Sequence, residues 1–97
     1  MVIEDDQDLR DSLQRLLQEK YTISMAANGE EGLKLVQDIK PDMILSDVMM
    51  PIMDGFELCK QLKRKKETSC IPIILLTAKI NDKDYLEGLN CGADAYI

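Results

Sequence analysis

Apolar residues in this chain fall into two alternating patterns. Strand-like segments occupy positions 1–3, 21–25, 43–45, 71–76 and 95–97, and in 21–25 the apolar residues alternate with Thr22 and Ser24. Between these segments, apolar residues recur three or four positions apart, which is the spacing of one face of an amphipathic helix. The pattern predicts five strands that alternate with four helices.

Each predicted helix has an apolar face. The apolar faces consist of Leu9, Leu13, Leu16 and Leu17; of Leu33, Val36 and Ile39; of Phe56, Cys59 and Leu62; and of Tyr85, Leu86 and Leu89. Asp6 or Asp8 can cap the first helix and Asn81 the fourth, while the turn Asn28-Gly29 leads into the second and Asp54-Gly55 opens the third. Pro41 ends the second helix, Gly92 follows the fourth, and the basic run 63–66 is expected to form a solvated end of the third.

Strict alternation of strands and helices predicts a parallel sheet, because consecutive parallel strands need a helical crossover. The run 71–76 is apolar on both faces, as expected for a strand covered by helices on two sides. We therefore expect an α/β fold of the doubly wound, flavodoxin-like type, with a five-stranded parallel sheet in the order 2-1-3-4-5. No linker or repeat interrupts the 97 residues, which fit a single domain over 1–97.

The composition of the chain argues against several classes of function. Eighteen acidic and twelve basic residues give a net charge of −6, which argues against direct binding of nucleic acid phosphates. No apolar run approaches the roughly 18 residues of a membrane span, and no signal-peptide pattern opens the chain. We expect a cytoplasmic protein without membrane insertion.

Cysteine and histidine usage excludes several chemistries. Cys59, Cys70 and Cys91 are odd in number and widely spaced, so buried reduced thiols are expected rather than a disulfide framework or a zinc site. The absence of histidine excludes a Ser-His triad, a histidine general base and a phosphohistidine carrier. Phosphoryl chemistry in this chain would have to use a carboxylate.

Acidic residues follow two of the predicted strands. Glu4 and Asp5 come after the first strand, and Asp47 comes after the third. These strands are neighbours about 4.8 Å apart in the expected sheet order, so their carboxyl ends meet at the topological switch point. Three close carboxylates store repulsion on the order of 10 kcal/mol, which protonation or a metal ion must relieve. Oxygen ligands with room for water and phosphate favour Mg²⁺ over Ca²⁺.

Five segments, taken together, resemble the receiver domains of two-component response regulators. They are Glu4-Asp5, the loop 46–51 around Asp47, Asp54-Gly55, Leu76-Thr77-Ala78 and Gly92-Ala93-Asp94-Ala95-Tyr96. The resemblance spans essentially the whole chain and implies a bacterial phosphorelay signalling domain rather than an enzyme. The segments 69–78 and 87–89 are also similar to receivers of hybrid sensor kinases that carry a DNA-binding output domain.

The resemblance implies a role for each residue of the acidic cluster. Asp47 would be the nucleophile that accepts a phosphoryl group from the phosphohistidine of a partner histidine kinase. Asp5 would hold Mg²⁺ directly and Glu4 through water, with Asp47 and the backbone carbonyl of Met49 as further ligands. Independently of the resemblance, a carboxylate that attacks phosphorus needs charge neutralisation, which a shared Mg²⁺ supplies.

A switch is also implied by the resemblance. The Thr77 hydroxyl would bond a phosphoryl oxygen on Asp47, and the aromatic side chain of Tyr96 would follow. That movement would bias the surface around helix four and strand five between two states and so control an output domain or a homodimer.

The chain departs from the family near its ends. The family's lysine lies three residues after the strand-five aromatic, which is position 99, beyond Ile97; Lys79 does not occupy that position. The first strand begins late and the fifth helix is missing, so we expect a fragment truncated at both ends. A missing helix would uncover on the order of 400 Å² of apolar surface, worth roughly 10 kcal/mol, so poor stability of this span is expected.

Three other functions were weighed against this one. A haloacid-dehalogenase-type phosphatase needs a second aspartate two residues after its nucleophile, where this chain has Met49. A flavodoxin needs a hydroxyl- and glycine-rich phosphate loop where this chain has Glu4-Asp5-Asp6. The remaining alternative is a pseudo-receiver that binds protein partners without phosphorylation, and the intact Asp5 and Asp47 weigh against it.

Overall fold

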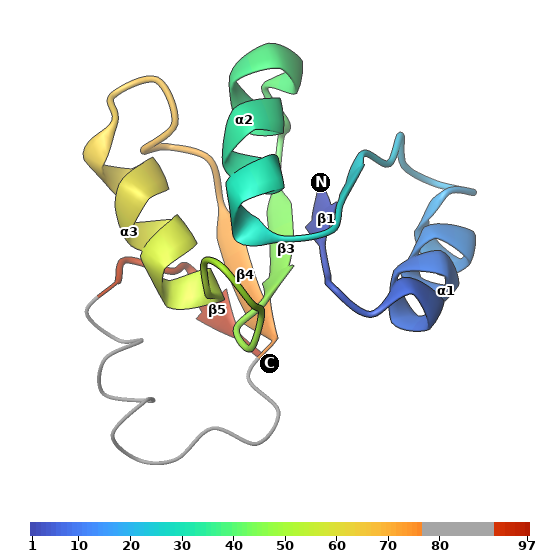
Figure 1. Ribbon diagram of the computed structural model, residues 1–97. Helices are drawn as coiled ribbons and strands as arrows, with labels where there is room; N and C mark the ends of the chain where they lie inside the picture. Colours follow the sequence, from blue (N-terminus) through green and yellow to red (C-terminus); the bar gives the residue numbers. More distant parts are fainter. Residues whose placement is uncertain (77–90) are drawn as a thin grey trace.

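The computed structural model describes residues 1–76 and 91–97, which form a five-stranded parallel sheet in the order β2-β1-β3-β4-β5 (Figure 1). The strands are β1 Val2–Ile3, β2 Met25–Ala26, β3 Ile44–Asp47, β4 Ile73–Leu76 and β5 Ala95–Tyr96. The expected flavodoxin-like sheet order is therefore confirmed.

Three helices are described, and each begins where the sequence predicted a helix start. They are α1 Gln7–Leu17, α2 Gly29–Ile39 and α3 Gly55–Arg64. The carboxylate of Asp6 accepts hydrogen bonds from the backbone of Asp8 and Leu9. The side chains of Asn28 and Asp54 accept from N–H groups in the first turns of α2 and α3, at 2.8 Å in both cases. Each cap satisfies backbone donors that the first turn leaves without an intrahelical partner. The predicted fourth helix lies outside the described residues.

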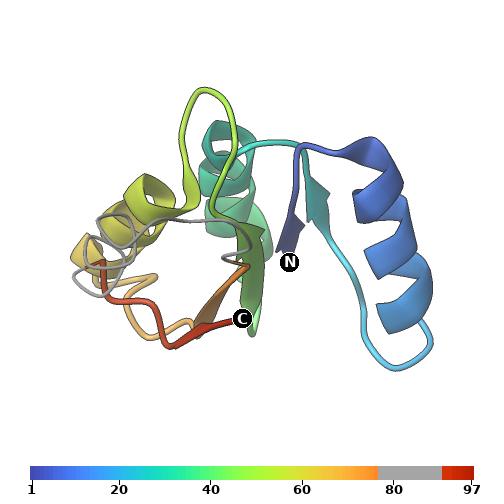
Figure 2. The same ribbon diagram turned by 90° about the horizontal axis from the view of Figure 1, so that it is seen from below.

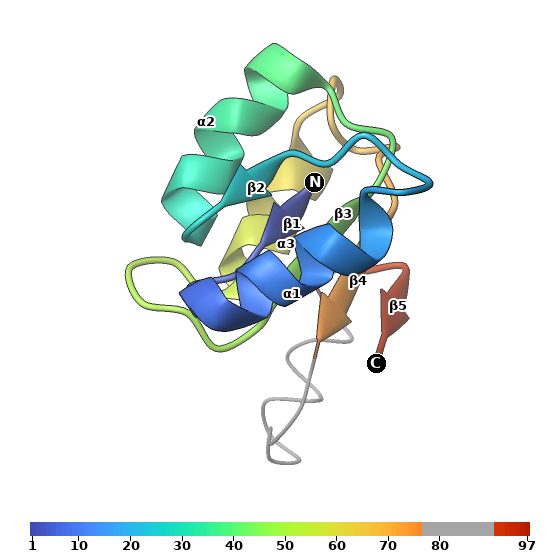
Figure 3. The same ribbon diagram turned by 90° about the vertical axis from the view of Figure 1, so that its right-hand side faces the viewer.

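The sheet separates the described helices into two layers. Figures 1 and 2 show α2 and α3 on one face of the sheet, and Figure 3 shows α1 crossing the other face. Burial along β3 and β4 alternates accordingly: Ile44, Ser46, Ile73 and Leu75 are buried, whereas the residues between them are only partly buried. The core therefore lies between the sheet and the α2–α3 layer.

The helix α1 contradicts one expectation from the sequence. None of its residues is buried; Leu13 and Leu17 are half-buried, and Leu16 is 74% exposed. Its apolar stripe meets only β1 closely, and no second described helix lies beside it on this face (Figure 3). In α2 the expected inward residue Ile39 is also exposed, by 44%, because it occupies the last helical position.

Strand boundaries differ from the prediction. The segment 21–25 was expected to be a strand, but β2 is only Met25–Ala26, since its partner β1 is two residues long and pairs Val2 with Met25 and Ile3 with Ala26. The strand β3 continues past the expected end at residue 45, because it pairs with β4 as far as Asp47 and Leu76. This extension makes Asp47 the last residue of a central strand.

None of the helices in the described ranges is both long and apolar enough to cross a lipid bilayer.

Candidate functional site

The carboxyl ends of β1 and β3 bring the predicted acidic residues together. These strands are adjacent and in register, with Val2 opposite Leu45 and Ile3 opposite Ser46. One carboxylate oxygen from each of Glu4, Asp5 and Asp47 lies within 4.8 Å of the others. The three residues singled out from the sequence thus form one cluster.

Asp47 is held at the end of β3 by its own loop. Its Oδ1 accepts a hydrogen bond from the backbone N–H of Met49 at 3.3 Å, and its side chain is partly exposed. Among the described residues, no backbone N–H donates to its other carboxylate oxygen.

The start of α3 packs directly against this loop through Gly55. The backbone N–H of Gly55 donates to the carbonyl of Val48 at 2.9 Å. A Cβ atom on Gly55 would lie 2.5 Å from the backbone oxygen of Asp47 and 2.9 Å from the Cα of Val48. Only glycine therefore permits α3 to approach the end of β3 this closely. The sequence showed Gly55 as a helix start, but not this steric requirement.

Glu4 is the most buried member of the cluster, with 2% of its surface exposed. Its Oε1 accepts a hydrogen bond from the backbone of Asp6 at 3.1 Å, whereas its buried Oε2 has no hydrogen-bond partner among the described residues. Burial, then the charge of Asp47 and contacts with both aspartates, raise the pKa of Glu4 to about 7. A proton shared with an aspartate would satisfy Oε2, but full ionisation leaves that oxygen unsatisfied.

Positive charge does not neutralise the cluster within the described part of the chain. The ion pairs there are Lys34 with Glu30 and Lys63 with Asp94, both outside the cluster. The guanidinium of Arg10 donates to the backbone carbonyl of Glu4 at 2.8 Å, rather than to its carboxylate. Among the described residues, no cationic side chain therefore balances the charge of the cluster.

The donor set suits a hard divalent cation. All three side chains offer oxygen, and the buried Oε2 of Glu4 has no hydrogen-bond partner among the described residues. Asp5 is exposed, so positions facing solvent remain for water and phosphate. These features fit Mg²⁺.

Other predicted site residues are placed less completely. The side chain of Met49 is 60% exposed, as expected if its role belongs to the backbone, and its carbonyl as a ligand stays a prediction. The backbone of Tyr96 lies in β5 opposite Leu75. Its side chain and the whole of Thr77 lie outside the described residues, so their roles in a switch stay predictions.

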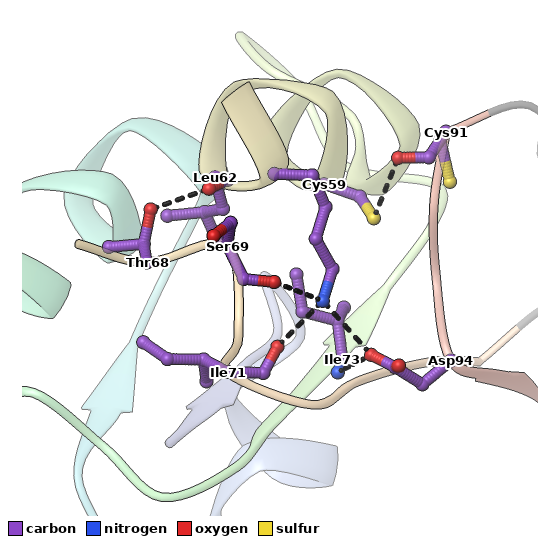
Figure 4. A network of polar contacts seen from close by, with 9 residues as sticks. Cys59, Leu62, Thr68, Ser69, Ile71, Ile73, Cys91 and Asp94 are labelled. Atoms are coloured by element: carbon purple, nitrogen blue, oxygen red, sulfur yellow. Dashed lines mark hydrogen bonds and ion pairs between the residues drawn. The ribbon is translucent and has the colours of Figure 1, made fainter. Parts of the chain in front are cut away.

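One polar network at the far end of α3 was not predictable from the sequence pattern. Lys63, expected to be solvated, is 20% exposed, and its Nζ donates to Asp94 Oδ2 and to the backbone carbonyls of Ser69 and Ile71 (Figure 4). Asp94 belongs to a segment that was noted for its resemblance, but its partner lies 31 residues away. Cys70, expected to be buried, is exposed in the connection between α3 and β4.

Comparisons with known proteins identify the family of this chain. The family profile described as response regulator receiver domain matches residues 1–97. The chain is 45% identical over its full length to the transcriptional regulatory protein AfsQ1 of Streptomyces coelicolor and 44% identical to histidine kinase P4 of Formosa agariphila. It spans 42% of the first relative and 7% of the second.

Solved structures show the same architecture. The signal receiver domain of a histidine kinase from Syntrophus aciditrophicus superimposes with a TM-score of 0.93 at 38% identity, covering 99% of this chain and 74% of that chain. The chemotaxis protein CheY4 of Vibrio cholerae superimposes with a TM-score of 0.90 at 32% identity, covering 99% of this chain and 81% of that chain.

Proposed function

Because the chain belongs to the response regulator receiver domain family of two-component systems, we propose that it accepts a phosphoryl group on Asp47 with the help of Mg²⁺. The observation that carries this proposal is the convergence of Glu4, Asp5 and Asp47 within 4.8 Å, with Oε2 of Glu4 buried and unpartnered. A merely structural acidic cluster gains nothing from that arrangement, since unpaired buried carboxylate costs free energy.

The residues divide the chemistry among them. Asp5 would hold Mg²⁺ directly and Glu4 through water, while Asp47 and the backbone carbonyl of Met49 complete the protein ligands. When bound, the ion would neutralise the negative charge of the carboxylates and of the incoming phosphoryl oxygens. The N–H of Met49 fixes the Asp47 carboxylate through Oδ1 and leaves the other oxygen to attack.

Phosphoryl transfer needs no other nucleophile. The free oxygen of Asp47 forms a P–O bond as the P–N bond of a partner kinase's phosphohistidine breaks. The electron pair of that bond stays on the imidazole nitrogen, and the product on Asp47 is an acyl phosphate. The role is that of a phosphoacceptor in signalling, and its slow self-dephosphorylation is incidental to it.

The signal would then reach a partner. In this proposal the Thr77 hydroxyl donates to a phosphoryl oxygen, Tyr96 follows, and the surface near strand β5 shifts between two states that control an output domain or a homodimer. Relatives that are regulators or kinases are longer than this chain, which supports a larger cytoplasmic parent protein with its own output.

The test is the intact mass of the chain after incubation with acetyl phosphate, with Mg²⁺ and with a chelator in its place. We expect a gain of about 80 Da, one phosphoryl group, only with Mg²⁺. Asp47→Asn should abolish the gain. Asp42→Asn is the matched control, because Asp42 is exposed and precedes the start of β3, at the opposite end of the strand from Asp47. This substitution should leave the mass gain intact.

Circular dichroism of each variant separates loss of the site from loss of the fold. A folded chain that binds Mg²⁺ but gains no mass would contradict the proposal and favour a pseudo-receiver that works without phosphorylation. Thr77→Ala should leave the mass gain unchanged while it weakens the phosphorylation-dependent change in partner binding, and Thr77→Ser should restore that change.

A further inference from the structure

Two buried cysteines meet where α3 passes the segment leading to β5. Cys59 is 0% exposed and Cys91 is 3% exposed. The thiol of Cys59 donates a hydrogen bond to the backbone carbonyl of Cys91 at 3.3 Å, although the residues are 32 positions apart. Figure 4 shows the Cys59 sulfur directed from α3 at this carbonyl oxygen.

The surrounding contacts hold the two cysteines in place. Lys63 lies one helical turn after Cys59, and its Nζ is 3.1 Å from Asp94, three residues after Cys91. Gly92 lies against the stem of Lys63, since a Cβ there would be 3.2 Å from its Cγ. These two contacts with α3 fix the path of residues 91–94. In the folded domain the two cysteines are therefore already close, and bringing them together costs no further chain entropy.

The surface beside Cys91 has a hollow that a small reagent could enter, and its lining favours a reagent with negative charge. A hollow of about 450 Å³ is lined by Lys60, Lys63, Arg64, Cys91 and Gly92. Three cationic side chains at one small hollow favour an anionic reagent. Glutathione disulfide, which carries several carboxylates, is a small oxidant of that kind.

We propose that Cys59 and Cys91 are an oxidisable thiol pair that closes to an intramolecular disulfide when a small acidic disulfide such as glutathione disulfide is in excess. Thiol–disulfide exchange forms the Cys59–Cys91 S–S bond and breaks the S–S bond of the reagent. The two electrons and two protons lost by the protein leave in two molecules of glutathione. The pair lies outside the acidic cluster, so the proposal does not rest on phosphorylation.

The reduced pair should be slow to react. Burial, then contact with the Cys91 thiol, raises the pKa of Cys59 to about 12, and exchange requires thiolate. Sustained oxidising conditions rather than a brief pulse would therefore close the bond, and the decisive measurement is an equilibrium. Closing a loop of about 33 residues should raise the folding equilibrium constant on the order of a few hundredfold by chain entropy.

The test uses the full chain carrying Cys70→Ser, which removes the exposed thiol and leaves only the pair. The protein is equilibrated in glutathione buffers of graded potential, in buffer and in urea, then acid-quenched, alkylated and weighed. We expect the oxidised chain to carry no alkyl group. The equilibrium constant for forming the disulfide should be at least tenfold larger for the folded chain than for the unfolded chain, because folding and bond formation are linked. An equal or smaller constant in the folded chain would overturn the proposal.

Single variants in the same background supply the controls. Cys59→Ala and Cys91→Ala cannot close the bond, so at every potential each should carry either one alkylated thiol or one glutathione adduct. The oxidised Cys70→Ser chain should stay monomeric and unfold at higher urea, and dithiothreitol should reverse both the mass change and the shift. Glutathione adducts or covalent dimers in place of the internal bond would also overturn the proposal. Peptide mapping of the unsubstituted chain provides an independent measurement of the same linkage.

Discussion

The Nζ atom of Lys63 lies 3.1 Å from Oδ2 of Asp94, and the same oxygen accepts a 2.8 Å hydrogen bond from the backbone N–H of Ile73 (Figure 4). One carboxylate therefore joins α3 to the starts of β4 and β5. The lysine is 20% exposed, so this pair is less screened by water than an ordinary surface ion pair.

Replacing Lys63 with methionine should destabilise the chain by about 1–2 kcal/mol, because Asp94 and two backbone carbonyls lose a charged donor while the apolar stem is kept. Urea unfolding monitored by circular dichroism measures the change. Lys66→Met, at an exposed position of the same basic run, should change stability by less than about 0.5 kcal/mol. Equal effects of the two substitutions would contradict the assigned network.

Asp94 should also contribute to the acid sensitivity of the fold. The Ile73 N–H and then Lys63 hold the pKa of Asp94 below its usual value of 3.8. The stability it supplies is therefore present above that value and is lost as pH falls through the lower pKa of the folded chain. In a comparison of unfolding free energies from neutral pH into the acid range, Asp94→Asn should flatten the acid-side loss. An unchanged acid-side slope would show that Asp94 is not held in this way.

The buried carboxyl of Glu4 should make the chain less stable as pH rises in metal-free solution, the opposite of the effect of Asp94. The pKa of Glu4 is raised from 4.5 to about 7, first by burial, so the stability that protonation supplies is complete below 4.5 and is lost as pH rises toward 7. With a chelator present, stability should fall across this window by an amount on the order of 2–3 kcal/mol. Glu4→Gln should remove the fall.

Addition of Mg²⁺ should reverse the same loss, since a bound cation favours ionised carboxylates. The measurement is the urea midpoint at neutral pH against Mg²⁺ concentration. K⁺ at matched ionic strength is the control. If Mg²⁺ leaves the midpoint where K⁺ does, the cluster is not a divalent-cation site.

Gly55 should tolerate no larger residue. The Cβ of Gly55→Ala would lie 2.5 Å from the backbone oxygen of Asp47. The Asp47 backbone could relieve this clash only by shifting the loop that carries the acidic residue. We expect a loss of roughly 2 kcal/mol or more in stability and weaker Mg²⁺ binding. Gly32→Ala is a useful comparison, because the nearest atoms to its Cβ would all belong to the Ile3 side chain rather than to backbone and alanine favours a helix interior. Mg²⁺ binding by the Gly32 variant should be unchanged, and equal losses of binding in both variants would refute this role of Gly55.

Ile52 is strained in the loop after Asp47. It has a φ of 72° and a side chain that is 76% exposed, so a β-branched residue occupies left-handed backbone without gaining burial. Ile52→Gly should stabilise the chain by up to about 1 kcal/mol, the relief of backbone strain being partly offset by the greater freedom of glycine when unfolded. Ile52→Val keeps the strain and should show no gain. A stabilisation shared by both variants in urea unfolding would point to the lost apolar surface instead.

The sequence by itself determined the architecture and the members of the acidic site. Apolar runs alternating with helical spacing require parallel strands joined by crossovers, and the observed order β2-β1-β3-β4-β5 follows. The cap at Asp6 and the helix starts at Asn28-Gly29 and Asp54-Gly55 were predictable because these residues act on backbone only two or three residues away. Glu4, Asp5 and Asp47 were predictable because the carboxyl ends of neighbouring parallel strands coincide.

Only the tertiary structure decided which of these groups are buried and which distant residues pair. In the folded chain β2 is only as long as the strand β1 that it pairs with, and α1 has no buried residue. Glu4 is buried, whereas Asp5 is exposed. The tertiary structure also joined Lys63 to Asp94 and Cys59 to Cys91, across 31 and 32 residues. Periodicity and capping are local properties that a sequence carries directly, whereas burial and long-range pairing depend on surfaces that come together only when the chain has folded.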